Sequence, residues 1–136
     1  MSPPLEPTSP PTYLYKLIPH TAAPPHPLPD ALPLSALDAS SGFIHLSTAA
    51  QLGGTLGRFF ADAPKMYILK LRYAPLRDTE LVRWEDAPGG EGVFPHLYNG
   101  MKLGKDEVEE VGFWERDEKT WEEVAHEREE AGWLVW

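Results

Sequence analysis

Two of the five histidines, His45 and His96, lie in short apolar segments and are the residues best placed for chemistry. Each is followed two residues later by a hydroxyl side chain, Ser47 in one segment and Tyr98 in the other. A single histidine in such a segment is most simply a buried side chain bonded to the backbone. Two histidines with similar apolar flanks and following hydroxyls favour a shared polar pocket beside the core.

A third element is Glu85, which ends an apolar segment and precedes a glycine-containing loop. A carboxylate in this position is placed where side chains converge in a cleft. The alternative, that Glu85 is the first solvated residue after a strand, fits the sequence equally well. Gln51 stands three residues after Thr48, and this capping-box spacing accounts for it fully.

A pocket with these side chains suits a nucleoside-like ligand. An aromatic side chain such as Trp84 stacks on a base, and imidazoles and hydroxyls bond to ribose. Glu85 could then stabilise an oxocarbenium-like transition state at an anomeric carbon. The sequence motifs of serine hydrolases with a Gly-x-Ser-x-Gly turn, of P-loop NTPases and of Rossmann enzymes are absent.

A metal-dependent hydrolase using His45, Glu85 and His96 is an alternative, because two histidines and a carboxylate can form a facial triad. These residues are separated by 40 and 11 positions, whereas the ligand pairs of familiar metal motifs stand close together. The chain has no cysteine, which excludes disulfides, thiolate metal sites and a cysteine nucleophile. We therefore expect no bound metal.

Charge and hydropathy exclude some classes of binding partner. Lys and Arg number 12 against 21 Asp and Glu, a net charge of −9, and residues 104–136 hold 12 of the acids with only 4 bases. No stripe of Lys and Arg offers the basic surface that nucleic-acid backbones require. No apolar run approaches the roughly 20 residues of a membrane helix, and the N-terminus lacks a signal-peptide pattern. We expect a cytoplasmic protein that binds neither membranes nor nucleic acids in general.

The spacing of apolar residues predicts strands and helices around these candidates. A helix begins at Thr48 and ends before Pro64. Its three glycines indicate close backbone packing, approach to a ligand, or simply a helix of low stability. A short helical turn is expected over 34–38. Strands are expected at 12–18, 43–46, 66–73, 80–85, 93–98 and 108–114. This order predicts an α+β fold in which one helix packs against a mostly antiparallel sheet.

The chain divides into three parts by composition. Residues 1–11 are rich in proline, which predicts a disordered leader. Residues 12–116 form a single α+β domain. Residues 117–136 form an acidic helix that Asp117 caps and that runs to about Ala131. Its three tryptophans predict that it docks on the domain or on a second subunit, and the second case would make the protein a homodimer.

Four blocks in consistent order resemble domain-of-unknown-function family 952, and the resemblance covers about residues 12–114. The blocks are Ser41–Gln51, Thr55 with Arg58–Phe60, Arg83–Glu85 and Phe94–Tyr98. That family looks like a distant branch of the ADP-ribosyltransferase-like superfamily. The resemblance implies a split β-barrel around an NAD cleft, with NAD as a substrate.

The resemblance also implies site residues. Those in the matching blocks are His45, Ser47, Gln51, Glu85, His96 and Tyr98. In the superfamily a histidine on an early strand bonds the adenosine ribose, and a late carboxylate promotes loss of nicotinamide. Many family members have histidine where this chain has Lys16, so Lys16 would substitute as a donor, for instance to a phosphate.

Three functions remain open at this point. The first is an NAD-utilising or ADP-ribose-handling enzyme, an ADP-ribosyltransferase or an NAD glycohydrolase, with Glu85, His96 and His45 as catalytic residues. Its ligand-binding residues would be Ser47, Gln51, Tyr98, Lys16 and Trp84. The second is a non-catalytic module that binds a nucleotide or another small metabolite. The third is the metal-dependent hydrolase.

Overall fold

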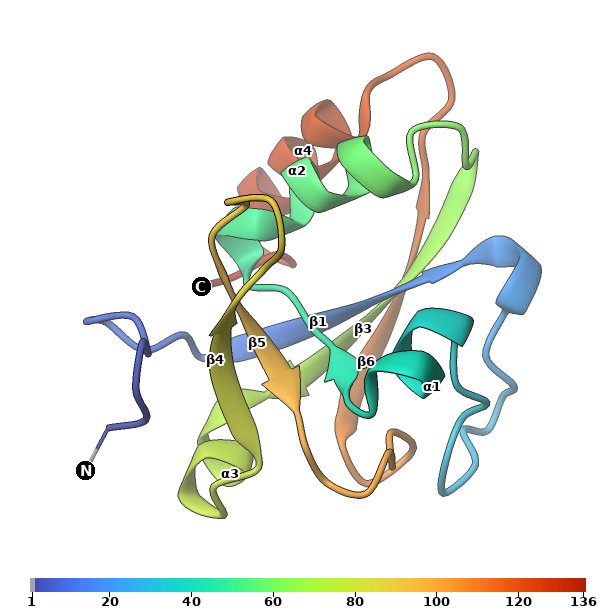
Figure 1. Ribbon diagram of the computed structural model, residues 1–136. Coiled ribbons are helices and arrows are strands. Elements are labelled where there is room, and N and C mark those ends of the chain that lie inside the picture. Colours follow the sequence, from blue (N-terminus) through green and yellow to red (C-terminus); the bar gives the residue numbers. More distant parts are fainter. Residues whose placement is uncertain (1) are drawn as a thin grey trace.

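The computed structural model describes residues 2–136, and its strands form two three-stranded antiparallel sheets (Figure 1). The first sheet has the order β1-β3-β6, and the second has the order β2-β5-β4. Backbone hydrogen bonds between Tyr15 and Ser47 join the two sheets at one point. The strands are β1 (Tyr13–Pro19), β2 (Ile44–His45), β3 (Lys65–Arg72), β4 (Val82–Asp86), β5 (Val93–Leu97) and β6 (Val108–Glu115).

Four α-helices and one short 3-10 helix connect or cover these strands within residues 2–136. The α+β class and the antiparallel pairing predicted from the sequence are confirmed. Within the same residues the strands do not close into a barrel. The helices are η1 (His20–Ala22), α1 (Ala36–Ser41), α2 (Ala49–Phe59), α3 (Tyr73–Asp78) and α4 (Trp121–Glu130).

The first sheet contributes side chains to two cores, because the residues along its strands point alternately to its two faces. One face packs against the inner face of the second sheet. The buried residues of this first core include Leu14, Leu69, Leu71, Ile44, Trp84 and Leu97. The other face packs against α2 and α4, which lie side by side above it (Figure 1). The buried residues of this second core include Tyr15, Ile68, Trp114, Leu52, Leu56, Trp121 and Val124.

The glycines of α2 serve its packing on α4. A Cβ atom at Gly53 would lie 3.2 Å from the Cβ of Ala125, and one at Gly57 would lie 2.6 Å from the Glu122 carboxylate. A Cβ at Gly54 would meet nothing within 4 Å. Close backbone packing, one of the three explanations that the sequence offered, therefore applies to Gly53 and Gly57 but not to Gly54.

The C-terminal segment folds back onto the first sheet. Trp121 is buried and donates its indole N–H to the Phe60 carbonyl over 2.8 Å. The Tyr15 hydroxyl donates to the Val135 carbonyl and accepts from the Val135 N–H, each over 2.9 Å. The N-cap of α4 is Thr120, whose hydroxyl accepts from the Glu123 N–H. The prediction that Asp117 caps this helix was therefore wrong by three positions.

The proline-rich leader contacts α3, a helix that the sequence analysis did not predict. Glu6 accepts hydrogen bonds from the Tyr73 hydroxyl and from the Arg77 guanidinium. The domain boundaries drawn after residues 11 and 116 stay predictions. No helix within residues 2–136 has the length and the apolar composition that crossing a bilayer would require.

Candidate functional site

The candidate site lies on the outer face of the second sheet. The inner side chains of its strands, such as Ile44, Trp84 and Leu97, are buried in the first core. Because successive side chains point to opposite faces, the residues between them face outward. The outward-facing set is Phe43, His45, Arg83, Glu85, Phe94, His96 and Tyr98.

His45 and His96 are brought together by strand pairing. In the antiparallel register of β2 and β5, His45 lies directly opposite His96. Their ring centroids are 5.1 Å apart, in an edge-on arrangement. The His45 side chain is 31% exposed and that of His96 is 8% exposed. The fold therefore brings the two histidines together, as the sequence analysis predicted.

Asp38 holds His45 in place. One Asp38 oxygen, Oδ1, accepts from the backbone N–H of His45 over 3.1 Å and lies 2.7 Å from its Nδ1. The other oxygen, Oδ2, accepts from the Lys16 ammonium over 2.6 Å. Asp38 belongs to α1, which Ser35 caps and which ends at Gly42 with a left-handed φ of 82°. This glycine turns the chain from α1 into β2, so the helix and the histidine stay in contact.

Glu85 holds His96 in the same way from the opposite side. Its Oε1 lies 2.8 Å from Nδ1 of His96 and accepts from the Tyr98 hydroxyl over 2.6 Å. Glu85 is on β4, its partner His96 is on the neighbouring strand β5, and its partner Tyr98 directly follows that strand. The three residues predicted to share a site, His45, Glu85 and His96, are thus connected through contacts in the sheet.

Both carboxyl groups are ionised at neutral pH. Burial by itself raises the pKa of Asp38. Hydrogen bonds from His45 and the charge of Lys16 outweigh burial and bring this pKa down to about 2. Burial likewise raises the pKa of Glu85, and the donors Tyr98 and His96 bring it below its usual value. Burial lowers the pKa of His96, and this effect outweighs the attraction of Glu85.

These carboxylates fix the tautomer of the two imidazoles. An ionised carboxylate accepts hydrogen bonds and donates none, so each Nδ1 facing it carries the hydrogen. Nε2 is then the free ring nitrogen of His45 and of His96, and neither has a hydrogen-bond partner within residues 2–136. A free Nε2 accepts a proton when the ring is neutral and donates one when it is protonated.

Phe43 and Arg83 complete the outer face. The Phe43 ring stacks on His96 with centroids 4.2 Å apart and an interplanar angle of 22°. The Arg83 guanidinium lies 4.1 Å from the centre of the Tyr98 ring, within cation–π range. A shallow hollow between the leader and β4 reaches this face, lined by Pro3, Pro4, Arg83 and Glu85 among others.

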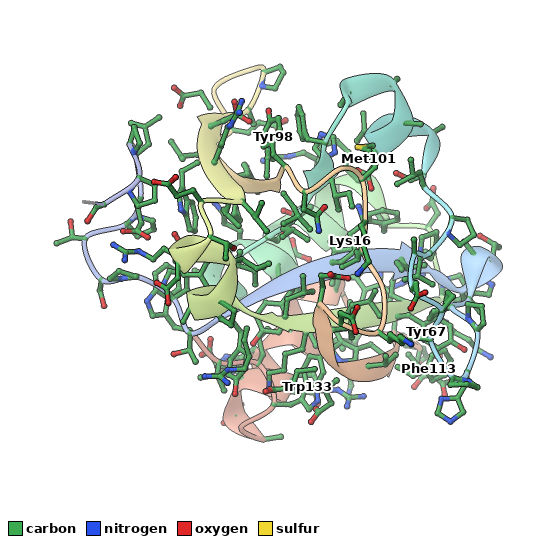
Figure 2. The ribbon with its side chains drawn as sticks, turned by 90° about the horizontal axis from the view of Figure 1, so that it is seen from below. Lys16, Tyr67, Tyr98, Met101, Phe113 and Trp133 are labelled. Carbon is green, nitrogen blue, oxygen red and sulfur yellow. The ribbon has the colours of Figure 1, made fainter. Side chains whose placement is uncertain are left out.

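The remaining predicted residues lie at the margin of the site or inside the fold. Lys16, labelled in Figure 2, is on β1, and its ammonium donates hydrogen bonds to Asp38 and to the His45 carbonyl. Ser47 is buried and joins β1 through its backbone. Gln51 closes the predicted capping box with Thr48, which confirms that role, and it also donates to the Val93 carbonyl over 2.6 Å.

Trp84 faces away from the histidines. Its side chain is buried in the first core, and its indole N–H donates to the Tyr73 hydroxyl over 2.9 Å. A role in stacking on a bound base, as expected from the sequence, is not available to a ring in this position. The outer face instead offers the aromatic side chains of Phe43, Phe94 and Tyr98.

Sequence reasoning missed Asp38, Phe43 and Arg83. Two of them carried a usable signal, since Phe43 precedes His45 by two residues and Arg83 precedes Glu85 by two. In a strand this spacing places side chains on the same face. Within residues 2–136, no group of three or more histidine, aspartate or glutamate side chains is arranged to hold a metal ion. A metal-dependent hydrolase thus lacks support from the geometry.

Comparisons with known proteins are consistent with this architecture and assign no activity. A family model described as "Protein of unknown function (DUF952)" matches residues 28–111. The crystal structure of protein CC0527 from Caulobacter crescentus is similar, with 30% identity and a TM-score of 0.62 over 80% of this chain and 91% of that one. The solution structure of CC0527 gives 30% identity and a TM-score of 0.57, over 74% and 83%. No curated protein matches the chain.

Proposed function

Because this chain belongs to the DUF952 family, whose description names no activity, we propose its function from the site itself. The protein is an enzyme that uses NAD or handles ADP-ribose, and it binds its ligand on the outer face of the second sheet. Two antiparallel sheets that are joined at one point and do not close within the described residues support an ADP-ribosyltransferase-like fold.

One observation carries the proposal: each imidazole is held at Nδ1 by its own carboxylate, so both Nε2 atoms are free on one face. Such preorganised nitrogens accept from ribose hydroxyls when neutral. A protonated imidazole instead donates from Nε2, for instance to a phosphate oxygen. Phe43 offers a flat apolar surface beside them, against which a nicotinamide or adenine ring can pack.

The proposed reaction is cleavage at the anomeric carbon of the nicotinamide ribose. The bond from C1′ to the nicotinamide nitrogen breaks, and its electron pair leaves with nicotinamide. An oxygen of water or of an acceptor hydroxyl forms the new bond to C1′, and its proton passes to Glu85 Oε2. Glu85 Oε2, the oxygen that His96 and Tyr98 leave free, stabilises the positive charge that develops on the ribose.

The test is release of nicotinamide from NAD by the full-length protein. His45→Gln and His96→Gln should each slow release by about tenfold or more, because each variant loses a hydrogen bond to the ligand. His126→Gln is the matched control, because His126 lies on α4 and pairs only with Glu130 on the surface. Absence of nicotinamide release, together with absence of NAD and ADP-ribose binding by calorimetry, would refute the proposal.

A non-catalytic binding module is the second candidate, and one observation favours it. Glu85 Oε1 already accepts from two donors, an arrangement that stabilises the ionised state and rigidifies the face. Glu85→Gln separates the two functions. In an enzyme this variant loses turnover and keeps most of its ADP-ribose affinity. In a binding module only the affinity changes, and the wild type shows no turnover.

A further inference from the structure

Three groups that bind anions lie in one row across the second sheet. His45 is the direct partner of His96 in the pairing of β2 with β5, and Arg83 is the direct partner of His96 in the pairing of β4 with β5. Direct cross-strand neighbours on one face of a sheet have Cβ atoms about 5 Å apart. The row therefore presents two imidazoles and a guanidinium at successive strand spacings.

One of the two negative charges beside this row is paired with a buried cation, and the other is held by hydrogen bonds. Asp38 is paired with the buried Lys16 ammonium over 2.6 Å, and its other oxygen is used by His45. Glu85 directs Oε1 at His96 and Tyr98. Arg83, in contrast, forms no ion pair within residues 2–136 and rests on the Tyr98 ring with its charge exposed. This exposed guanidinium at the end of the row is available for an external anion.

We propose that the row His45–His96–Arg83 binds the phosphate groups of the ligand. The inference rests on the proposed function in that it names which part of an NAD or ADP-ribose molecule occupies this row. Protonated imidazoles donate from Nε2, and guanidinium offers paired N–H donors that match phosphate oxygens. The ribose and its leaving group then lie toward Glu85, on the neighbouring row of β4.

The geometry also predicts how anion binding depends on pH. The groups that face the two imidazoles are Asp38, Lys16, Glu85, Tyr98 and Arg83. Asp38 and Glu85 stay ionised and Tyr98 stays neutral near pH 7, since the pKa of each carboxyl is lowered and that of the phenol is raised. Lys16 keeps its ion pair. Burial lowers the pKa of His96, so this imidazole gains its charge only on acidification, and anion affinity should rise as it does.

The experiment titrates the full-length protein with pyrophosphate and follows the imidazole signals of His45 and His96 by NMR. Arg83→Gln should weaken pyrophosphate binding about tenfold or more, the effect of losing one charge-assisted contact. Arg72→Gln is the control, because Arg72 is also exposed and has no ion pair within residues 2–136. Sulfate, whose charge is constant in this range, should bind more tightly at about pH 5.5 than at about pH 8.

The outcomes separate this inference from the proposed function. If pyrophosphate leaves the His45 and His96 signals unchanged, or if Arg83→Gln and Arg72→Gln behave alike, the anion row is refuted even if NAD is cleaved. If pyrophosphate binds as expected while NAD releases no nicotinamide and ADP-ribose does not bind, the row stands and the proposed function fails.

Discussion

His45 and His96 face each other across two paired strands, and each takes its carboxylate from a different element. Asp38 reaches His45 from α1, and Glu85 reaches His96 from β4. Asp38 and His45 are 7 residues apart in sequence, and Glu85 and His96 are 11 apart. The register of β2 and β5 places these two pairs beside each other. The site therefore depends on the pairing of these strands. Replacing either carboxylate should affect the imidazole that it contacts more than the other imidazole.

The buried Asp38 should make stability depend on acid pH. Its pKa falls from 3.8 to about 2 on folding. A depressed pKa contributes stability that is present above the unfolded value, and this stability is lost as the pH falls from about 4 through about 2. The contribution is roughly 2 kcal/mol. Urea unfolding measured at several pH values should show this loss in the wild type and a smaller loss in Asp38→Asn.

Asp38→Asn should also be less stable at neutral pH, because Lys16 would remain buried without its partner. Asp62→Asn is the control, since Asp62 is exposed in the loop before β3. If the two variants lost the same amount of stability between pH 4 and pH 2 as the wild type, Asp38 would not be the group that titrates.

Tyr98→Phe should raise the pKa of Glu85. Burial raises this pKa, and the Tyr98 hydroxyl is the first of the groups that bring it below its usual value. Removing that hydroxyl leaves His96 as the remaining donor to Oε1. The measurement is a titration of the Glu85 carboxyl carbon by NMR. Tyr67→Phe, on the first sheet against Phe113 (Figure 2), should leave the titration unchanged.

Tyr98→Phe should also change how the free energy of unfolding depends on pH. A lowered Glu85 pKa contributes stability above its unfolded value, and this stability disappears as the pH falls through the folded value. Tyr98→Phe should reduce this contribution. A Glu85 titration at the same midpoint in both proteins would show that the 2.6 Å hydroxyl contact does not form in solution.

Local patterns were sufficient to predict most elements and part of the site. Alternation identified the strands, and the spacing of Thr48 and Gln51 identified the start of α2. The helix α3 was missed because its six residues are too few to show a helical repeat, and its Pro75 lies in the first turn, where proline is tolerated. Trp84 was assigned to the site although it neighbours Glu85 directly. Adjacent residues of a strand point to opposite faces.

Asp38 could not be predicted from local patterns. Its role depends on the placement of α1 beside β2 and on Lys16, which arrives from β1 in the other sheet. A lone aspartate in a short helical turn gives no sign of burial, because buried carboxylates become favourable only when tertiary contacts supply their partners. Contacts between sheets are the information that a single sequence did not contain.

Trp121→Ala should strongly destabilise the protein. Trp121 is 1% exposed in the second core, and its indole donates to the Phe60 carbonyl. Replacing a buried tryptophan with alanine typically costs about 3–5 kcal/mol. Trp136→Ala should cost less than about 1 kcal/mol, since Trp136 is 38% exposed and makes a single hydrogen bond to Ser9. Equal losses in urea unfolding would contradict the docking of α4 on α2.

Two neighbouring glycines of α2 should respond differently to alanine. Gly54→Ala should raise the free energy of unfolding by about 1 kcal/mol, because alanine is the better helix former and its methyl group meets open space. Gly53→Ala gains the same propensity, but its Cβ would lie 3.2 Å from that of Ala125. The helices α2 and α4 must then separate by a few tenths of an ångström, which weakens the packing of Leu52 and Val124 in the second core. Urea unfolding should therefore rank Gly54→Ala above Gly53→Ala. Equal gains would mean that α4 does not press on α2 at this point.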